Sequence, residues 1–391
     1  MILLIQNIEV YTPEYIGVCD VVIGGDKIVA IDDSIDAIDH PMVEVMNGSG
    51  KCLAPGFVDS LVHISGGGGE GGFNSRTPDL SFHDAVRAGV TTLMGALGTD
   101  DVTRTLPELY GKAKSLTQDG LNCYIYTGSY SIPAKPLLNS IKEDIIFIDN
   151  ILGVGEVAIA DHRGSQPTTH ELARLASEAR VGGLLSGKSG VVLVHVGDGD
   201  EKLTRLHEVA NTYEVCLSQF YPTHINRTLS LLQAGAEFAQ LGGFIDLTAS
   251  TNQQLIDMGE LRASDGLKWL LDHDTPTSQI TFSSDAQGSL PHFNEDGKLD
   301  GLDVGSISSL HKELVRSVKE LNIDLSIALS CITKNPAAVL GLTKKGELKP
   351  ENDADLVIMD KATLAIESVM SRGQWLLKDK ALVAKTAFDI S

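Results

Sequence analysis

The chain has 391 residues, 42% of them hydrophobic and 21% charged, which is an ordinary composition for a globular enzyme with a large core. Its formal net charge of −21 at pH 7 argues against nucleic acid and anionic membranes as partners, because both would repel the protein. The five cysteines are scattered and form no CxxC pair, so neither a disulfide framework nor a cysteine zinc site is expected.

The first 53 residues predict short strands separated by turns. The first ten residues lack the basic region of a signal peptide and include the acidic Glu9, so we expect a first strand and a cytoplasmic protein. Apolar runs then flank Gly-Gly-Asp at residues 24–26, a pattern typical of a hairpin. No run of about 18 apolar residues occurs anywhere in the chain, so no membrane-spanning helix is expected.

From residue 55 the pattern changes to short apolar runs that end in polar residues and alternate with helical segments. Such alternation is typical of βα units and a parallel sheet. Eight candidate strands with their polar tips lie at 56–65, 91–100, 121–130, 155–163, 190–198, 217–227, 242–250 and 279–288. This number and spacing predict an α/β fold, a (β/α)8 TIM barrel whose catalytic groups lie at the C-terminal ends of the strands.

Beyond the barrel, residues 346–360 and 367–383 return to the strand-and-turn pattern of the first fifty residues. We therefore predict a small β-sandwich domain built from both chain termini. Its residues would be 1–54 plus 345–391, and the metal-dependent hydrolase barrel would span 55–344.

Five ionisable residues fall at the tips of predicted strands one, four, five, six and eight: His63, Glu156, His195, His224 and Asp285. Each alone is more often a structural residue, but the barrel would bring all five to one point. A few nitrogen and oxygen ligands with one open position suit catalytic zinc, which lowers the pKa of a bound water to around 7. Asp285 suits a general base that passes the water proton to a leaving amine.

Several segments resemble the amidohydrolase superfamily over nearly the whole chain: GFVDSLVH, HVGD, PTHINR, SSDAQGS and NDADLVIMD. A closer resemblance is to the isoaspartyl dipeptidases, and it rests on more specific motifs. These are GGGGEGG at 66–72, LGTD at 97–100, TGSY at 127–130, DHR at 161–163 and THINR at 223–227.

The resemblance implies a metallo-dipeptidase that hydrolyses β-aspartyl dipeptides through attack of metal-bound hydroxide. It implies a small dipeptide substrate, a homo-oligomer, and a substrate role for eight residues in all. Glu70 would bind the α-ammonium, with backbone groups of Gly68 and Gly69 nearby. Tyr130 would polarise the scissile carbonyl. Further substrate contacts would come from Thr99 and Ser289, and carboxylates would be held by Arg163 and Arg227.

The same residues also have structural interpretations. The glycine run at 66–69 resembles any flexible loop, and it is no phosphate-binding loop because no lysine follows it. Arg163 and Arg227 suit structural ion pairs, and Tyr130 suits packing at the barrel mouth.

Two positions depart from the family pattern at the metal site. Leu61 stands where the superfamily usually has the first histidine of His-x-His, and leucine cannot ligate a metal. Glu156 stands where the family usually has a carbamylated lysine that bridges two metals, and its carboxylate can bridge without modification. We therefore expect one tightly bound zinc at Glu156, His195 and His224, and a second metal that is weak or absent. The ligand types also suit Mn, Co or Fe.

Two other functions remain open from the sequence. One is an N-acyl-D-amino acid deacylase or deacetylase, against which Glu70 argues because an acylated amine has no free ammonium. The other is a catalytically weakened paralogue kept as a binding or scaffold protein, because Leu61 replaces a ligand. Asp285, His195 and His224 argue against the paralogue, since a barrel without catalysis need not keep them.

Overall fold

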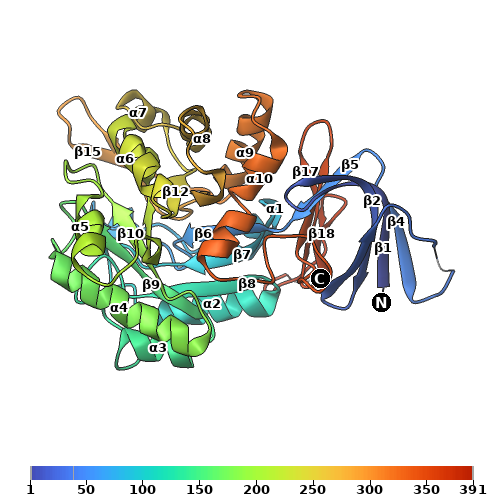
Figure 1. Cartoon of the computed structure of the whole chain (residues 1–391), viewed down its shortest axis with the longest axis horizontal. Coiled ribbons are helices and arrows are strands. Elements are labelled where there is room, and N and C mark those ends of the chain that lie inside the picture. The colour runs from blue at the N-terminus through green and yellow to red at the C-terminus, as the bar shows by residue number, and fades with distance from the viewer. Residues whose placement is uncertain (1, 38, 390–391) are drawn as a thin grey trace.

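The computed structural model describes residues 2–37 and 39–389. It has two parts, a barrel covered by helices and a β-sheet to which both ends of the chain contribute (Figure 1). Within the described residues, no helix is long and apolar enough to cross a membrane.

All eight predicted barrel strands are present: β6 (Phe57–Val62), β7 (Val90–Gly95), β8 (Asn122–Thr127), β9 (Ile151–Ile159), β10 (Val191–Val196), β11 (Phe220–Thr223), β12 (Ile245–Thr248) and β13 (Ile280–Ser283). The first six pair in parallel in chain order, and β12 pairs with β13 in parallel. β12 lies against β11 and β13 against β6, where a bridge from Val62 to Ala286 closes the ring. The predicted fold class is confirmed.

Helices surround the strands and bury their outer faces (Figure 1). They are α1 (Phe82–Arg87), α2 (Leu106–Asp119), α3 (Ile141–Phe147), α4 (Thr169–Ser186), α5 (Thr204–Thr212), α6 (Leu229–Gln240), α7 (Gln253–Asp257), α8 (Ala263–Asp272), α9 (Ser309–Lys319), α10 (Leu325–Ser330) and α11 (Lys334–Val339). The two longest begin with capping boxes, Thr105 with Glu108 and Thr168 with Glu171. Each box satisfies backbone N–H groups that a helix start leaves free, which fixes where the helix begins.

The strand β9 has an internal irregularity beside the site. It contains one residue more than its neighbours where it pairs with β8 and β10. A Cβ at Gly153 would lie 2.3 Å from the carbonyl oxygen of Val191, so only glycine fits there. The sequence predicted this strand to begin at Gly155, but it begins at Ile151. The glycines predicted a turn before the strand, whereas in the structure they lie at a bulge within it.

The interior of the barrel is filled by apolar side chains beneath the polar tips of the strands. Leu61 belongs to this layer and is fully buried with Met94, Tyr126 and Leu193. The position that departs from the family pattern is therefore a packing position in this chain.

The strands from both termini form one nine-stranded sheet: β1 (Ile2–Tyr11), β2 (Tyr15–Gly24), β3 (Lys27–Asp32), β4 (Val43–Asn47), β5 (Lys51–Pro55), β16 (Leu356–Asp360), β17 (Ile366–Ser371), β18 (Gln374–Lys378) and β19 (Ala381–Leu382). The predicted hairpin at Gly24–Asp26 joins β2 to β3. β5 and β16 pair antiparallel, which joins the two ends of the chain. Residues of β1, β2, β5 and β16 share one apolar core. The domain boundaries at residues 54 and 345 stay a prediction.

A buried polar junction attaches this sheet to the barrel. The side-chain amide of Asn122, at the start of β8, donates to Asp355 Oδ2 over 3.0 Å. Asp355 also accepts from Lys345 Nζ at 2.6 Å and from the Arg372 backbone N–H at 2.7 Å. Asp355 precedes β16, so one carboxylate connects the two parts of the molecule.

Candidate active site

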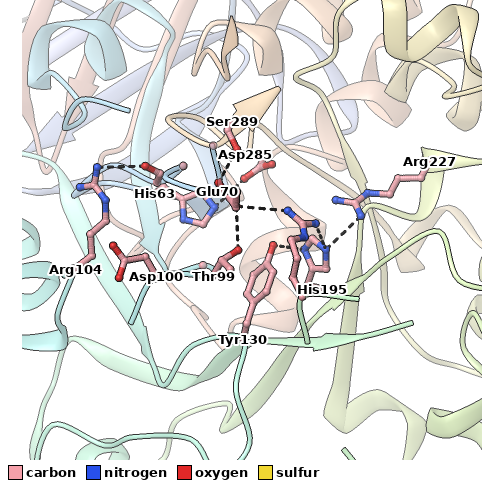
Figure 2. A pocket seen from close by; sticks show the side chains of 15 residues that line it. His63, Glu70, Thr99, Asp100, Arg104, Tyr130, His195, Arg227, Asp285 and Ser289 are labelled. Atoms are coloured by element: carbon pink, nitrogen blue, oxygen red, sulfur yellow. Dashed lines mark hydrogen bonds and ion pairs between the residues drawn. The ribbon is translucent and has the colours of Figure 1, made fainter. Parts of the chain in front are cut away.

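A pocket opens at the C-terminal ends of the barrel strands. Its walls come from the segments that follow β6, β7, β8, β9, β11 and β13, together with His195 of β10 (Figure 2). The side chains in this pocket are mostly charged or polar.

Three ligand-type residues meet in the barrel beside the pocket. Glu156 of β9, His195 of β10 and His224, which directly follows β11, place their ligand atoms within 4.8 Å of one another. Glu156 Oε1 lies 2.8 Å from His195 Nδ1 and 3.0 Å from His224 Nε2. Glu156 Oε2 is buried and has no hydrogen-bond partner among the described residues. This unpartnered oxygen and the two ring nitrogens fit a divalent cation.

His63 and Asp285 lie on the other side of Glu156. His63 Nε2 is 3.2 Å from Asp285 Oδ1 and 3.8 Å from Glu156 Oε2. His63 Nδ1 lies 3.2 Å from the carbonyl oxygen of Ala96, which can only accept, so Nε2 is the nitrogen turned to the carboxylates. Burial lowers the pKa of His63, but Asp285 and Glu156 outweigh it and raise the pKa to about 9. The two carboxylates therefore favour a cation at this position as well.

The protonation states in the cluster suit metal binding. Burial, the Arg227 guanidinium and His195 lower the pKa of His224 to about 4, so this ring is neutral at pH 7. Burial would raise the pKa of Glu156, but hydrogen bonds from His195 and His224 hold it well below its usual range. A neutral imidazole and an ionised carboxylate are the forms that ligate a metal. Thr248 Oγ1 lies 2.6 Å from His224 Nδ1 and fixes the ring from behind.

The glycine run is a fixed turn rather than a free loop. Arg104 is buried and donates hydrogen bonds to the carbonyl oxygens of Ser65, Gly67 and Thr77. Gly66 has φ +80°, and a Cβ there would lie 2.5 Å from the Thr77 carbonyl oxygen and 2.6 Å from the Arg104 guanidinium. The hydrogen bonds and the close contacts together hold the loop in one position.

Glu70 projects from this turn into the pocket (Figure 2). Thr99 Oγ1 donates to its Oε1 over 3.0 Å, and Ser289 Oγ lies 3.5 Å from its Oε2. Arg163 Nη1 lies 3.5 Å from Oε1. Thr99 and Ser289, predicted to contact substrate, therefore also position the Glu70 carboxylate.

Gly68 lines the pocket, but Gly69 does not. The Gly69 N–H donates to the Ser75 carbonyl oxygen, and its own carbonyl accepts from Gly72. The backbone amide predicted to face substrate at Gly69 is thus already used inside the turn.

The guanidinium groups of Arg163 and Arg227 also line the pocket. Arg163 is paired with Asp161 through Nη2 at 2.7 Å and Nε at 3.0 Å. Arg227 Nη1 lies 3.8 Å from Asp161 Oδ2. The structural ion pair considered from the sequence therefore exists at Arg163, yet both arginines also line the pocket.

Tyr130 lies between the arginines and the metal cluster. Its Oη is 2.7 Å from His195 Nδ1, and Arg163 Cζ lies 5.7 Å from the centre of its ring. Burial raises the pKa of Tyr130 well above its usual value, so the hydroxyl keeps its proton and can donate.

This geometry agrees with the comparison with known proteins. Residues 52–376 match the amidohydrolase family. The chain belongs to this family. The predicted class, a metal-dependent hydrolase, is confirmed by this membership.

Individual members of the family differ in what they do. The chain is 41% identical to a solved β-aspartyl dipeptidase from Fervidobacterium islandicum AW-1, in complex with β-Asp-Leu dipeptide, with a TM-score of 0.92 over 100% of both chains. It is 25% identical to a dihydroorotase of Lactobacillus gasseri, over 92% of this chain and 89% of that protein. It is 23% identical to a deacetylase of Brucella anthropi, over 89% and 82%. The first of these confirms the predicted resemblance to isoaspartyl dipeptidases.

Three residues of this amidohydrolase site had no role assigned from the sequence: Asp161, Arg104 and Thr248. The sequence did contain a signal for Asp161, because this residue lies at the polar tip of the predicted strand segment 155–163 and belongs to the DHR motif. Arg104 and Thr248 carried none, since their roles depend on partners from other segments of the chain.

Proposed function

We propose that the protein is a β-aspartyl dipeptidase that hydrolyses the side-chain amide linkage between aspartate and the next residue. The observation that carries this proposal is the arrangement of Glu70 and two arginines around the metal cluster. The dipeptidase at 41% identity, which is in complex with β-Asp-Leu, supports the same substrate class.

The charges of the pocket suit the β-linked peptide. In such a peptide one carbon carries both the free ammonium and a free carboxylate. Glu70 and Arg163 lie 3.5 Å apart and could bind these two groups together. Arg227 is left for the C-terminal carboxylate. In an α-linked peptide the carbon with the ammonium carries the scissile carbonyl instead, so it offers no such pair.

Each group of the cluster has a proposed role. A divalent cation held by Glu156, His195 and His224 would lower the pKa of a bound water to about 7. Asp285 takes a proton from the attacking water and delivers it to the leaving amine nitrogen. The Tyr130 hydroxyl donates to the carbonyl oxygen as its negative charge develops.

The metal content proposed here is one zinc per chain. Glu156, His195 and His224 form a three-ligand site, whereas the neighbouring position has His63 and Asp285 but only the Leu61 side chain where another ligand would stand. A second metal is therefore weakly bound or absent.

A zinc-dependent assay tests the substrate and the metal together. The protein is stripped with a chelator, zinc is added stepwise, and cleavage of β-Asp-Leu, α-Asp-Leu and an N-acetyl amino acid is followed. We expect cleavage of β-Asp-Leu alone, saturating at one zinc per chain. Turnover of the N-acetyl amino acid would favour the deacetylase, to which a relative at 23% identity points. No turnover with zinc bound would favour the weakened paralogue.

Leu61→His tests why the second metal is weak. We expect the variant to hold close to two zinc ions per chain, and its melting temperature to fall because a polar ring enters an apolar layer. Leu61→Ile, similar in volume and unable to ligate, serves as the control. Two zinc ions in the unaltered protein, purified without added metal, would contradict the proposal.

The homo-oligomer and the cytoplasmic location expected from the sequence stay predictions. Light scattering coupled to size-exclusion chromatography would determine the number of chains in solution.

A further inference from the structure

Asp161 is a buried carboxylate that contacts both halves of the site. It lies two residues after the end of β9 and is 7% exposed. Its Oδ2 lies 2.9 Å from His195 Nε2 and 2.7 Å from Arg163 Nη2. Its Oδ1 accepts from the side-chain Nε of Arg163 at 3.0 Å and from the backbone N–H of the same residue at 2.8 Å. The three contacts from Arg163 have fixed donors, and the contact with His195 Nε2 is a hydrogen bond when that nitrogen carries the ring proton.

The backbone holds Asp161 in place independently of the metal cluster. Its carbonyl oxygen accepts from the Gln166 side-chain amide at 2.8 Å and from the Gly164 N–H at 3.1 Å. A Cβ at Gly197 would lie 2.7 Å from the Asp161 Cβ, so the next strand approaches as closely as a glycine allows. The backbone contacts therefore fix the position of the Asp161 side chain, against which His195 and Arg163 are oriented.

The ring of His195 needs such an acceptor. Its Nδ1 is the nitrogen that faces Glu156, and Nδ1 can ligate a cation only when the ring proton is on Nε2. Two guanidinium nitrogens, Nη2 of Arg163 and Nη1 of Arg227, lie 3.3 and 3.2 Å from Nε2. Both are donors and favour an Nε2 without a proton. The carboxylate of Asp161 is the neighbour that accepts from Nε2 and reverses this preference.

We propose that Asp161 is a positioning residue that joins the metal ligand His195 to the two substrate-binding arginines, so that zinc affinity and substrate affinity depend on one carboxylate. The part of the proposal that concerns His195 and zinc affinity, the histidine half, stands on geometry alone. The part that concerns the arginines and substrate affinity rests on the proposed function.

Asp161→Asn tests both halves. The amide keeps the shape of the carboxylate, but its NH2 group replaces one of the two acceptor oxygens. This group then faces either His195 Nε2 and Arg163 Nη2, or the side-chain and backbone N–H groups of Arg163 that now donate to Oδ1. We expect the zinc dissociation constant, measured by competition with a chromogenic chelator, to rise about 10- to 100-fold. With zinc saturating, KM for β-Asp-Leu should rise about tenfold or more, because the arginines lose their alignment.

Asp101→Asn is the matched control. Asp101 is a largely buried carboxylate at the same end of the barrel, and it accepts from Ser129 at 2.9 Å and from Lys135 at 3.2 Å. It contacts neither His195 nor the arginines, so zinc affinity and KM should match the unaltered protein. Asp161→Glu keeps two acceptor oxygens and should recover part of the zinc affinity lost in Asp161→Asn.

Histidine-labelled 15N NMR of the unaltered, zinc-loaded protein provides a test that needs no variant. A proton on Nε2 of His195 supports the inference, and an Nε2 without a proton overturns it. Zinc affinity and KM unchanged in Asp161→Asn would overturn it as well. If β-Asp-Leu is not cleaved, the proposed function fails, but the zinc and NMR measurements still decide the histidine half.

Discussion

The hydroxyl of Tyr130 is kept protonated by burial and lies between the pocket and the metal cluster. A neutral phenol can donate to a developing oxyanion without giving up its proton. The same burial keeps water away, which strengthens a hydrogen bond to a charged oxygen.

Tyr130→Phe should lower kcat for β-Asp-Leu about 100- to 1,000-fold, as the loss of one oxyanion donor does in other hydrolases. KM should change little, because the arginines and Glu70 remain. Steady-state kinetics with zinc saturating measures both. Tyr126→Phe is the control: its hydroxyl donates to the Ser60 carbonyl oxygen inside the barrel, so stability should fall and kcat should not. Full activity in Tyr130→Phe would remove the residue from the mechanism.

The grouping of Glu156, His195 and His224 could be predicted from the sequence, because each residue lies in or directly after the C-terminal half of a strand, and a barrel brings these parts of its strands together. The role of Asp161 could not, since its partner His195 lies 34 positions later and the hydrogen bond depends on the orientation of the ring. Leu61 departs from the family pattern in the sequence alone, but only the structure shows that it packs with Tyr126 and Leu193.

At the scale of elements, the glycine turn after β6 matters most for the pocket. It carries Glu70, and Arg104 holds it through three carbonyl oxygens. The sequence showed the glycines but not the hydrogen bonds from Arg104, because every residue type has a carbonyl oxygen and the pattern of residues does not say which ones accept. Likewise, the eight strands were predictable from their apolar runs, whereas the early start of β9 was hidden by its glycines.

Gly66→Ala should displace the turn and lower kcat/KM for β-Asp-Leu about 100-fold, since an error of about 1 Å in positioning can cost that much. Gly25→Ala is the matched control: Gly25 also has positive φ, +64°, but a Cβ there meets nothing within 4 Å. That variant should lose about 1 kcal/mol of stability and keep its kcat/KM. Equal kinetics for both variants would show that the turn is not important for binding.

At the scale of the whole molecule, the barrel and the terminal sheet are joined through Asp355 and its donors. Asn122 is the barrel's donor in this junction, and it lies at the opposite end of β8 from Tyr130. The sequence predicted that the two chain ends build one unit, yet nothing in it specified that β5 would pair with β16.

Asn122→Ala should lower the free energy of unfolding by about 1–3 kcal/mol, because buried acceptors at Thr91, Asp355 and Ser371 each lose a donor. Urea unfolding measures the loss, and kcat should stay unchanged. Asn150→Ala, which removes a hydrogen bond to the Cys123 carbonyl oxygen and does not reach the terminal sheet, should cost less. Reduced kcat in Asn122→Ala would show that the junction also shapes the site.

The pairing of β5 with β16 also sets an order of events during synthesis on the ribosome. β5 ends at Pro55 and β16 begins at Leu356, so about 300 residues, or roughly 15–60 s of translation, separate the two strands. Until then this edge of β5 has no partner and is open to pairing with other chains. Its closure waits until β16 has been synthesised, so a chain that stops before β16 keeps an exposed strand that chaperones and proteases can recognise.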